Sequence, residues 1–232
     1  GGSSGDGAAV PGGPSAVTPE TRGDGRKYAA MPDGVGIRYE LLGDSGRCVV
    51  LTPGGQGGMC DGRMSQSQFP LLRRLLPERG YRVLLHDRRN CGSSDVGYGS
   101  GDASEGELQA QDLLMLLRHF RLEPAILIGN SSGGRLSLLL ARRWPFAVHS
   151  LVLMNLTGGP LAAEVLSREY YGRYLQAAES EEGMPAVARS GHYSELRRMN
   201  PQNAGRLKML PRSQFVKVKH PALVSFSMHR AR

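Results

Sequence analysis

The stretch ILIGNSSGGR (residues 126–135) decides the fold of this chain. An apolar run over 125–128 predicts a buried strand, and the apolar spacing over 132–144 predicts a helix. Between them, GNSSG (129–133) fits the pattern G-x-S-x-G, in which a serine occupies a tight turn from strand to helix. Glycines flank the serine so that neighbouring backbones can approach without Cβ clashes. The pattern and its context together predict that Ser131 is a catalytic nucleophile.

The neighbouring serine and a second glycine-rich loop are predicted to bind an oxyanion. Ser132 does not fit the nucleophile position, because the second glycine of the pattern must follow the nucleophile by two residues. Its backbone N–H is expected to point to the place where an oxyanion forms. The loop TPGGQGG (52–58) is expected to supply a second N–H, from Gly55 or alternatively from Gln56. The competing interpretation of this loop is a merely flexible turn.

The remaining pattern predicts alternating strands and helices. Asp33-Gly34 joins two short strands in a hairpin, and Ser104 with Glu107 forms a capping box at the start of a helix. Further strands are expected over 48–53, 81–87, 124–129 and 149–155, and helices over 65–80, 104–120 and 132–144. Such alternation, with almost continuously apolar strands, predicts an α/β fold with a mostly parallel sheet and helices on both faces.

Composition divides the chain into four parts. Residues 1–27 are rich in Gly, Pro and Ser and are expected to form a disordered lead. Residues 28–159 form the predicted α/β core, and 160–219 form a predicted helical cap inserted after a core strand. Residues 220–232 (HPALVSFSMHRAR) are interpreted as the remnant of a returning core strand. The sequence does not begin with Met, which suggests processing, a cloning scar or an incomplete record.

Charge and composition narrow the possible partners. The formal net charge is +8, and the surplus lies after residue 188, where ten Lys and Arg face Glu195 alone. The basic end lacks a nucleic-acid-binding motif and has few nearby aromatics, so a nucleic-acid partner is not expected. No segment has the roughly 20 apolar residues of a membrane span. The three cysteines lack paired spacings, which favours a reducing, cytoplasmic compartment. The expected partner is a small-molecule substrate.

The turn DRRNCGSSD (87–95) supplies a third recognisable element. On physical grounds it predicts a sharp turn in which Asp87 is satisfied by hydrogen bonds. From about Tyr28 to Gly159 the chain resembles the α/β-hydrolase superfamily, which has a glycine-rich loop, a D-x-R-x-x-G-x-S-D-like turn and a serine elbow in this order. Residues 160–210 resemble the helical cap of its peptidase-like and esterase-like members.

The resemblance implies a chemistry but not one substrate. It implies acyl-type hydrolysis by a serine, a histidine and an acid, with no metal or organic cofactor. Members of the superfamily include esterases, lipases, proline-specific peptidases, carbon–carbon bond hydrolases and cofactor-free haloperoxidases. Members with an aspartate nucleophile are excluded because Ser131 occupies that place.

Two features depart from the family pattern. Pro53 replaces the supporting histidine that often opens the glycine-rich loop. The family's acid after the returning strand falls near His229, and no catalytic-histidine loop follows before Arg232. An acid after the strand over 149–155 would fall at Asn155 or Thr157, which do not ionise. Glu164 is the nearest carboxylate, but it is not favoured.

None of the six histidines is assigned as the base. The most suitable by position is His229, and the others are His86, His119, His149, His192 and His220. A serine hydroxyl without a base is a weak nucleophile. The sequence therefore predicts a serine hydrolase that is inactive or impaired as recorded, with its last portion missing. The alternative is a non-catalytic ligand-binding or regulatory protein that keeps the elbow pocket.

Two other features receive structural interpretations. Cys60 and Cys91 lie in loops near the expected site, but a thiol nucleophile is disfavoured because neither occupies the elbow. The aromatic cluster YYGRY (170–174) either lines a substrate pocket or packs the cap onto the sheet, and its helical spacing favours packing.

Overall fold

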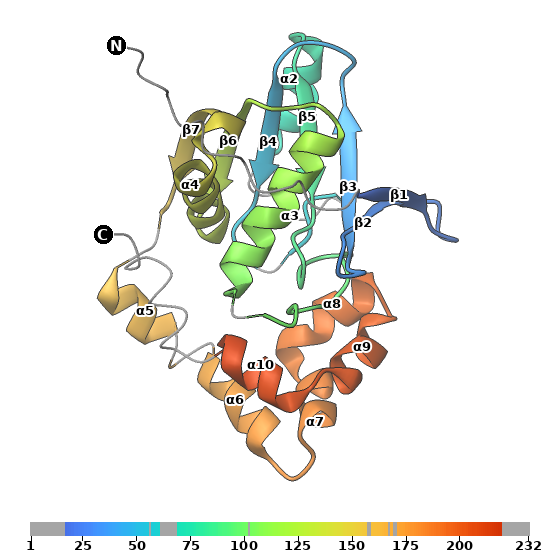
Figure 1. Ribbon diagram of the computed structural model, residues 1–232, viewed down its shortest axis with the longest axis vertical. Helices are drawn as coiled ribbons and strands as arrows, with labels where there is room; N and C mark the ends of the chain where they lie inside the picture. The colour runs from blue at the N-terminus through green and yellow to red at the C-terminus, as the bar shows by residue number, and fades with distance from the viewer. Residues whose placement is uncertain are drawn as a thin grey trace, which may run out of the picture.

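The computed structural model contains a sheet with helices on both faces and a separate group of helices at one end (Figure 1). It describes residues 17–55, 57–60, 69–101, 103–156, 159–166, 168 and 171–219. Within these ranges the sheet has seven strands in the order β1-β2-β3-β5-β4-β6-β7. The strands are β1 (Thr18–Thr21), β2 (Lys27–Ala30), β3 (Gly36–Leu42), β4 (Cys48–Thr52), β5 (Arg82–His86), β6 (Ala125–Asn130) and β7 (Val148–Met154).

The sheet is mixed, and its parallel half holds the elbow. Strands β5, β4, β6 and β7 run parallel, with Val50 of β4 opposite Leu84 of β5 on one side and Leu127 of β6 on the other. Strands β1, β2 and β3 pair antiparallel, and β3 pairs antiparallel with β5. The predicted α/β fold class is therefore confirmed. Parallel pairing brings the carboxyl ends of β5, β4 and β6 to the same edge of the sheet.

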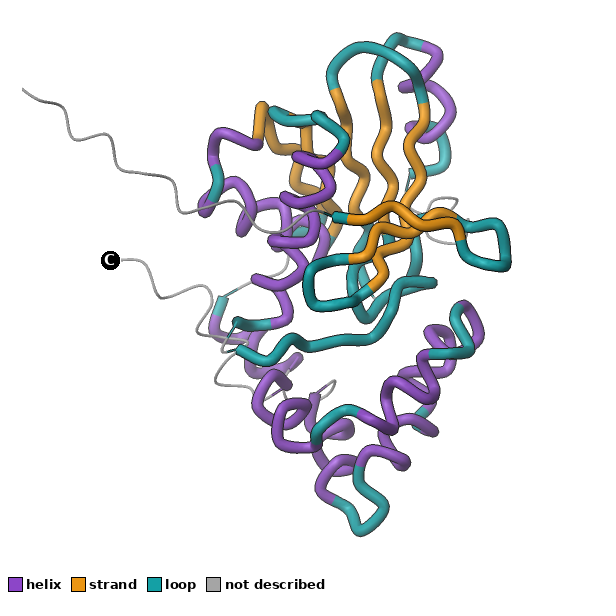
Figure 2. The backbone as a smooth tube through the Cα atoms, turned by 45° about the vertical axis from the view of Figure 1, so that its right-hand side comes forward, coloured by secondary structure: helices purple, strands orange, loops and turns teal. Residues whose placement is uncertain are grey.

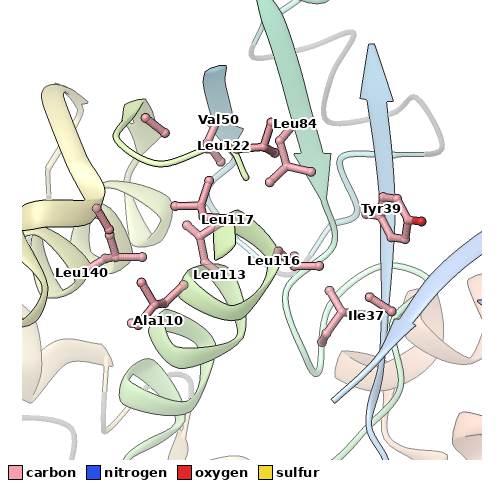
Figure 3. Close-up of a cluster of buried hydrophobic side chains, with 14 of the residues drawn as sticks. Ile37, Tyr39, Val50, Leu84, Ala110, Leu113, Leu116, Leu117, Leu122 and Leu140 are labelled. Carbon is pink, nitrogen blue, oxygen red and sulfur yellow. The ribbon is translucent and has the colours of Figure 1, made fainter. Parts of the chain in front are cut away.

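Alternate residues of the parallel strands face two cores. Val50, Leu84 and Leu127 pack in a cluster with α3 (Glu105–His119) and α4 (Ser132–Arg143), as Figure 3 shows for α3. The intervening residues Val49, Leu51, Val83 and Leu85 face α2 (Leu72–Glu78) on the other side. The predicted capping box at the start of α3 is present, with the Glu107 N–H donating to the Ser104 hydroxyl. The expected strand periodicity of two thus places helices on both faces.

A second group of helices lies at the carboxyl edge of the parallel strands (Figures 1 and 2). The helices after β7 are α5 (Pro160–Leu166), α6 (Gly172–Glu179), α7 (Met184–Arg189), α8 (Ser194–Met199), α9 (Asn203–Met209) and α10 (Arg212–Lys219). They fall within 160–219, the range expected for a helical insertion. Tyr174 is buried in their core and contacts Tyr171 and Tyr193. Tyr171 and Tyr174 of the YYGRY cluster therefore contribute to helix packing.

Some expectations differ from the structure, and others fall outside the described residues. Disorder was expected over 1–27, but residues 18–21 form β1, paired with β2. Of the helix expected over 65–80, residues Leu72–Glu78 form α2, and residues 65–68 lie outside the described residues. Gln56, residues 61–68 and the strand expected over 220–228 lie outside the described residues. Among the described helices, none is long and apolar enough to cross a membrane.

Candidate active site

Ser131 occupies a strained turn between β6 and α4. Its backbone has φ 51° and ψ −116°, in the left-handed half of conformational space that a residue with a side chain rarely adopts. The Ser131 N–H donates to the carbonyl of Met154 at the end of β7, 2.9 Å away, which anchors the turn. Its side chain is partly exposed. This is the backbone geometry expected of a serine in a G-x-S-x-G turn.

The glycines of the turn are required by close backbone contacts. A Cβ on Gly129 would lie 2.5 Å from the carbonyl oxygen of Gly133. A Cβ on Gly133 would lie 2.2 Å from the carbonyl oxygen of Thr52, at the end of β4. Real Cβ atoms do not approach backbone atoms so closely, so both positions exclude any side chain. The start of α4 can therefore pack directly against the ends of β6 and β4.

The glycine-rich loop after β4 lies against the same turn. A Cβ on Gly54 would sit 2.8 Å from the Cβ of Ser131, so only a glycine lets the loop approach this closely. Gly55 follows with φ +69°, a conformation that glycine adopts without strain. The structure thus places the loop containing Gly55 beside Ser131 and Ser132, which brings together the three residues that the sequence assigned to the site.

Arg88 links the two segments. One guanidinium nitrogen, Nη1, donates to the Ser132 hydroxyl at 3.3 Å, and the other, Nη2, donates to the carbonyl of Gly55. Gln109 of α3 accepts a further bond from Nη1 at 3.4 Å. Sequence reasoning missed this residue, because an arginine after a strand is most often a solvated surface side chain. Its position directly after Asp87, close to the carboxyl end of β5, is the sequence feature that could have indicated a role near the site.

The carboxylate of Asp87 is satisfied by hydrogen bonds, as the sequence predicted. Its buried carboxylate accepts the N–H groups of Met59, Cys60 and Ser93. Because Met59 and Cys60 follow the glycine-rich loop, Asp87 anchors the far end of this loop to the turn after β5. Asp87 therefore acts as a structural anchor near the elbow.

The histidines with described side chains do not hydrogen-bond to Ser131. His86 is fully buried at the end of β5, and burial, followed by the nearby charge of Arg88, lowers its pKa to about 3. His119 and His149 are exposed on α3 and β7. The His192 side chain and the residues His220 and His229 lie outside the described parts of the structure. Within the described parts, no histidine is placed as the base for Ser131.

The residue directly after β7 adopts a left-handed backbone conformation. Asn155 has φ 47°, and its side-chain amide donates to the side-chain oxygen Oδ1 of Asn130 at 3.0 Å. One of the two positions considered for an acid in this segment thus holds an amide that braces the residue before the elbow. The other, Thr157, lies outside the described residues, and Glu164 lies on α5.

The three cysteines do not present reactive thiols. All three are buried. Burial raises the pKa of the Cys48 thiol to about 12 and raises that of Cys91 as well. Because a thiolate is the nucleophilic form, these environments oppose thiol chemistry. This agrees with the choice of Ser131.

Buried polar contacts attach the helical group to the sheet. Asp95, in the turn after β5, accepts from the two terminal guanidinium nitrogens of Arg22 at 2.8 Å and from the side-chain amide of Asn200 at 3.0 Å. Arg206 of α9 lies 3.1 Å from the same carboxylate. The Asn203 side chain accepts from the N–H of Val96 at 3.0 Å. The helices α8 and α9 are therefore fastened to the turn that follows Arg88.

Comparison with known proteins agrees with this architecture. Residues 48–179, more than half of the chain, match the family model described as alpha/beta hydrolase fold. The chain belongs to the α/β-hydrolase family. It is 34% identical over 139 residues to a 2-hydroxy-6-oxononadienedioate/2-hydroxy-6-oxononatrienedioate hydrolase of Escherichia coli K12, a match that covers 57% of this chain and 46% of the relative. The chain thus spans about half the length of the curated relatives it matches.

Solved structures show the same fold. A hydrolase from Pseudomonas aeruginosa PA01 superposes with a TM-score of 0.54 at 23% identity, over 88% of this chain and 74% of the other. An enol-lactonase from Burkholderia xenovorans LB400 superposes with a TM-score of 0.52 at 21% identity, over 85% and 73% of the two chains. At this identity the likeness establishes the α/β-hydrolase fold of the chain.

Proposed function

We propose that the protein is a serine hydrolase that cleaves a small ester, amide or related acyl substrate. Ser131 attacks the acyl carbon, and the N–H groups of Gly55 and Ser132 bind the oxyanion that forms. The observation that carries this proposal is the contact between the two segments, in which Gly54 lies against Ser131 and Gly55 follows it. This arrangement favours two N–H donors beside one serine, which is the geometry that stabilises a tetrahedral intermediate.

The reaction requires a base in addition to these residues. The proton of the Ser131 hydroxyl must pass to a histidine as the bond to the acyl carbon forms, and a carboxylate must orient that histidine. The proposal places both groups outside the described residues. The helices α6 to α10 lie at the carboxyl edge of the parallel strands, where the proposed cap would cover a small-molecule substrate.

The substrate class follows from the family. The E. coli relative is named as a hydrolase of a dienedioate, and the structural neighbour from Burkholderia as an enol-lactonase. The first name describes hydrolysis of an oxo dicarboxylate, and the second describes hydrolysis of an enol-lactone. Both reactions place negative charge on an oxygen beside the attacked carbon, so the proposed oxyanion site serves either.

A second candidate function is a ligand-binding protein without catalysis. It is favoured by the observation that none of the three histidines with described side chains hydrogen-bonds to Ser131. An elbow without a base loses several orders of magnitude in rate, and its N–H donors remain able to bind a ligand. This candidate predicts saturable binding of a small molecule, seen as thermal stabilisation, without turnover.

Reaction with a fluorophosphonate probe separates the two candidates. A serine hydrolase is expected to form a covalent adduct on Ser131, mapped by mass spectrometry of peptides, and the Ser131→Ala variant to form none. Ser132→Ala is the matched control, because it removes the adjacent hydroxyl and keeps the backbone N–H, so it should still react at Ser131. A folded wild-type protein that forms no adduct would exclude an activated serine and leave the binding function.

A further inference from the structure

Arg88 is buried beside the elbow and contacts only uncharged acceptors. It is 5% exposed and follows β5 by two residues. Its guanidinium donates to the Gly55 carbonyl, the Ser132 hydroxyl and the Gln109 side-chain carbonyl. Among the described residues, no carboxylate forms an ion pair with it. The carboxylate of Glu105 feels the charge of Arg88 through space, but it is paired with Lys219 at 2.6 Å. A buried cation that no carboxylate binds directly is unfavourable, so packing alone does not explain this residue.

The next residue shows what a structural buried arginine looks like in the same turn. Arg89 is 2% exposed, and its guanidinium makes two bonds of 2.6 Å to the carboxylate of Asp112. A third bond of 2.9 Å joins it to Asp33. Arg89 is therefore bound directly by two acids, whereas the hydrogen bonds of Arg88 all go to uncharged groups at the elbow and on α3.

The acceptors of Arg88 belong to the two segments that carry the proposed oxyanion donors. Gly55 lies in the loop after β4, and Ser132 is the first residue of α4. The loop has two consecutive glycines, Gly54 and Gly55, so its peptide groups can rotate at little steric cost. A hydrogen bond to the Gly55 carbonyl opposes this rotation, and the bond to the Ser132 hydroxyl fixes the loop to the helix.

We propose that Arg88 is a positioning residue that holds the Gly55 loop and the start of α4 at the separation needed to bind an oxyanion. This inference rests on the proposed function. Through the Gly55 carbonyl, Arg88 restrains the peptide group that follows Gly55, and through the Ser132 hydroxyl it fixes the distance between the two donor segments. It touches neither the nucleophile nor the substrate in this role, and it acts through the two donor segments.

The first test measures the rate of fluorophosphonate labelling at Ser131. Arg88→Met removes the donors and the charge at similar length, and its maximal labelling rate should fall at least about tenfold, since removing a whole oxyanion donor costs 10² or more. The probe concentration at half-maximal rate should stay within about twofold, because ground-state binding is not affected. An unchanged maximal rate in a folded Arg88→Met variant would overturn the proposal.

Arg82→Met is the matched control for that variant. Arg82 lies at the opposite end of β5. Like Arg88, it donates to the carbonyl of a glycine, Gly46, at 3.0 Å. Its removal should leave the labelling rate of Ser131 unchanged. An equal loss in both variants would mean that the effect is general destabilisation, and the positioning role would be rejected.

Two milder variants keep the test decisive if Arg88→Met does not fold. Arg88→Lys keeps the charge but has a single nitrogen, which cannot reach the Gly55 carbonyl and the Ser132 hydroxyl together, so labelling should recover only in part. Ser132→Ala removes one acceptor and should slow labelling a few-fold. Combined with Arg88→Lys, it should add little, because both changes break the same link. If the losses of labelling rate in the two single variants added fully in the double variant, Arg88 and Ser132 would act independently and the proposed link between them would be contradicted.

Hydrogen exchange separates failure of this inference from failure of the proposed function. In Arg88→Lys the amides of Gly54 and Gly55 should exchange on the order of tenfold faster than in the wild type, whether or not Ser131 reacts. Wild-type protein that forms no adduct, with this faster exchange in the variant, would reject the serine hydrolase and keep the positioning contact. Unchanged exchange in the variant would reject the contact itself.

Discussion

The elbow and the junction between the sheet and helices α8 and α9 both hold distant segments together, but by opposite means. At the elbow, backbone meets backbone, because Gly129 and Gly133 have no side chain to separate β6, α4 and β4. At the junction, the buried side chain of Asp95 gathers partners from the N-terminal hairpin and from the helices. The elbow thus depends on glycines that allow close backbone packing, and the junction depends on the buried carboxylate of Asp95 and its polar partners.

This difference determines how each region responds to change. Backbone atoms in contact cannot move apart without shifting whole elements, so the elbow tolerates no added atom and is insensitive to pH and salt. Ionic contacts depend on protonation, and the exposed ones also depend on ionic strength. Mutations at the elbow should therefore act through sterics, and mutations at the junction through electrostatics.

The largest effect is expected from Gly133→Ala. The new Cβ would lie 2.2 Å from the carbonyl oxygen of Thr52 and 2.7 Å from that of Pro53, both of which are backbone atoms. Such overpacking should lower the free energy of unfolding by about 3 kcal/mol or more. Urea denaturation followed by circular dichroism measures this loss.

Gly205→Ala is the control for that substitution. Gly205 lies in α9, and apart from neighbouring residues of its own helix no atom lies within 4 Å of the added Cβ, so alanine should stabilise the helix by up to about 1 kcal/mol. If Gly133→Ala instead changed stability by no more than Gly205→Ala does, the close packing of the elbow against β4 would be contradicted.

A smaller loss is expected at the junction from Asp95→Ala. The substitution leaves Arg22 and Arg206 without their shared acid, and it should cost about 2 kcal/mol, less than a fully buried pair because both arginines are partly exposed. The exposed pair of Glu195 and Arg198 supplies the control, since Glu195→Gln should leave the urea midpoint almost unchanged. Equal midpoints for both variants would show that the junction adds no stability.

The same acid predicts a dependence on pH. The hydrogen bond from Arg22 and the charge of Arg206 outweigh burial and hold the pKa of Asp95 below its usual value of 3.8. The folded state therefore binds this proton less readily than the unfolded state does. The contribution of Asp95 is fully present above the unfolded pKa and is lost as the pH falls through the lower, folded pKa. Asp95→Asn should reduce the loss of unfolding free energy as the pH is lowered, measured by urea denaturation at a series of acidic pH values. An unchanged loss would mean that other groups cause the acid dependence.

The comparison also explains how much of the molecule the sequence predicted. The elbow, the glycine-rich loop and the capping box depend on residues a few positions apart, so their spacing and the strands and helices beside them were enough to predict them. The junction was not predicted, because Asn203 and Val96 are separated by 107 residues and ordinary loop residues carry the contact. Strand β1 was missed because TPET is short, polar and exposed, so no alternating apolar pattern marks it. Arg88 was missed because its role depends on its burial beside Gly55 and Ser132, which are distant from it in the sequence.

The smallest effect is expected from the strain at Ser131, and it tests whether the elbow stores energy for function. Ser131→Ala and Ser131→Gly both remove the hydroxyl, but only glycine adopts φ 51° without strain. Ser131→Gly should therefore be more stable than Ser131→Ala by about 1 kcal/mol, in spite of the greater freedom of glycine in the unfolded chain. Both variants should be inert to fluorophosphonate.

Ser137 provides the matched comparison six residues further on, inside α4. Its hydroxyl donates to the carbonyl of Gly133, and its backbone is helical. There the order should reverse, with Ser137→Gly less stable than Ser137→Ala by about 1 kcal/mol, because glycine weakens a helix interior. Opposite orders at the two serines would locate the strain at the nucleophile position. The same order at both would mean that Ser131 is held without strain, and that the close glycine contacts alone determine the geometry of the elbow.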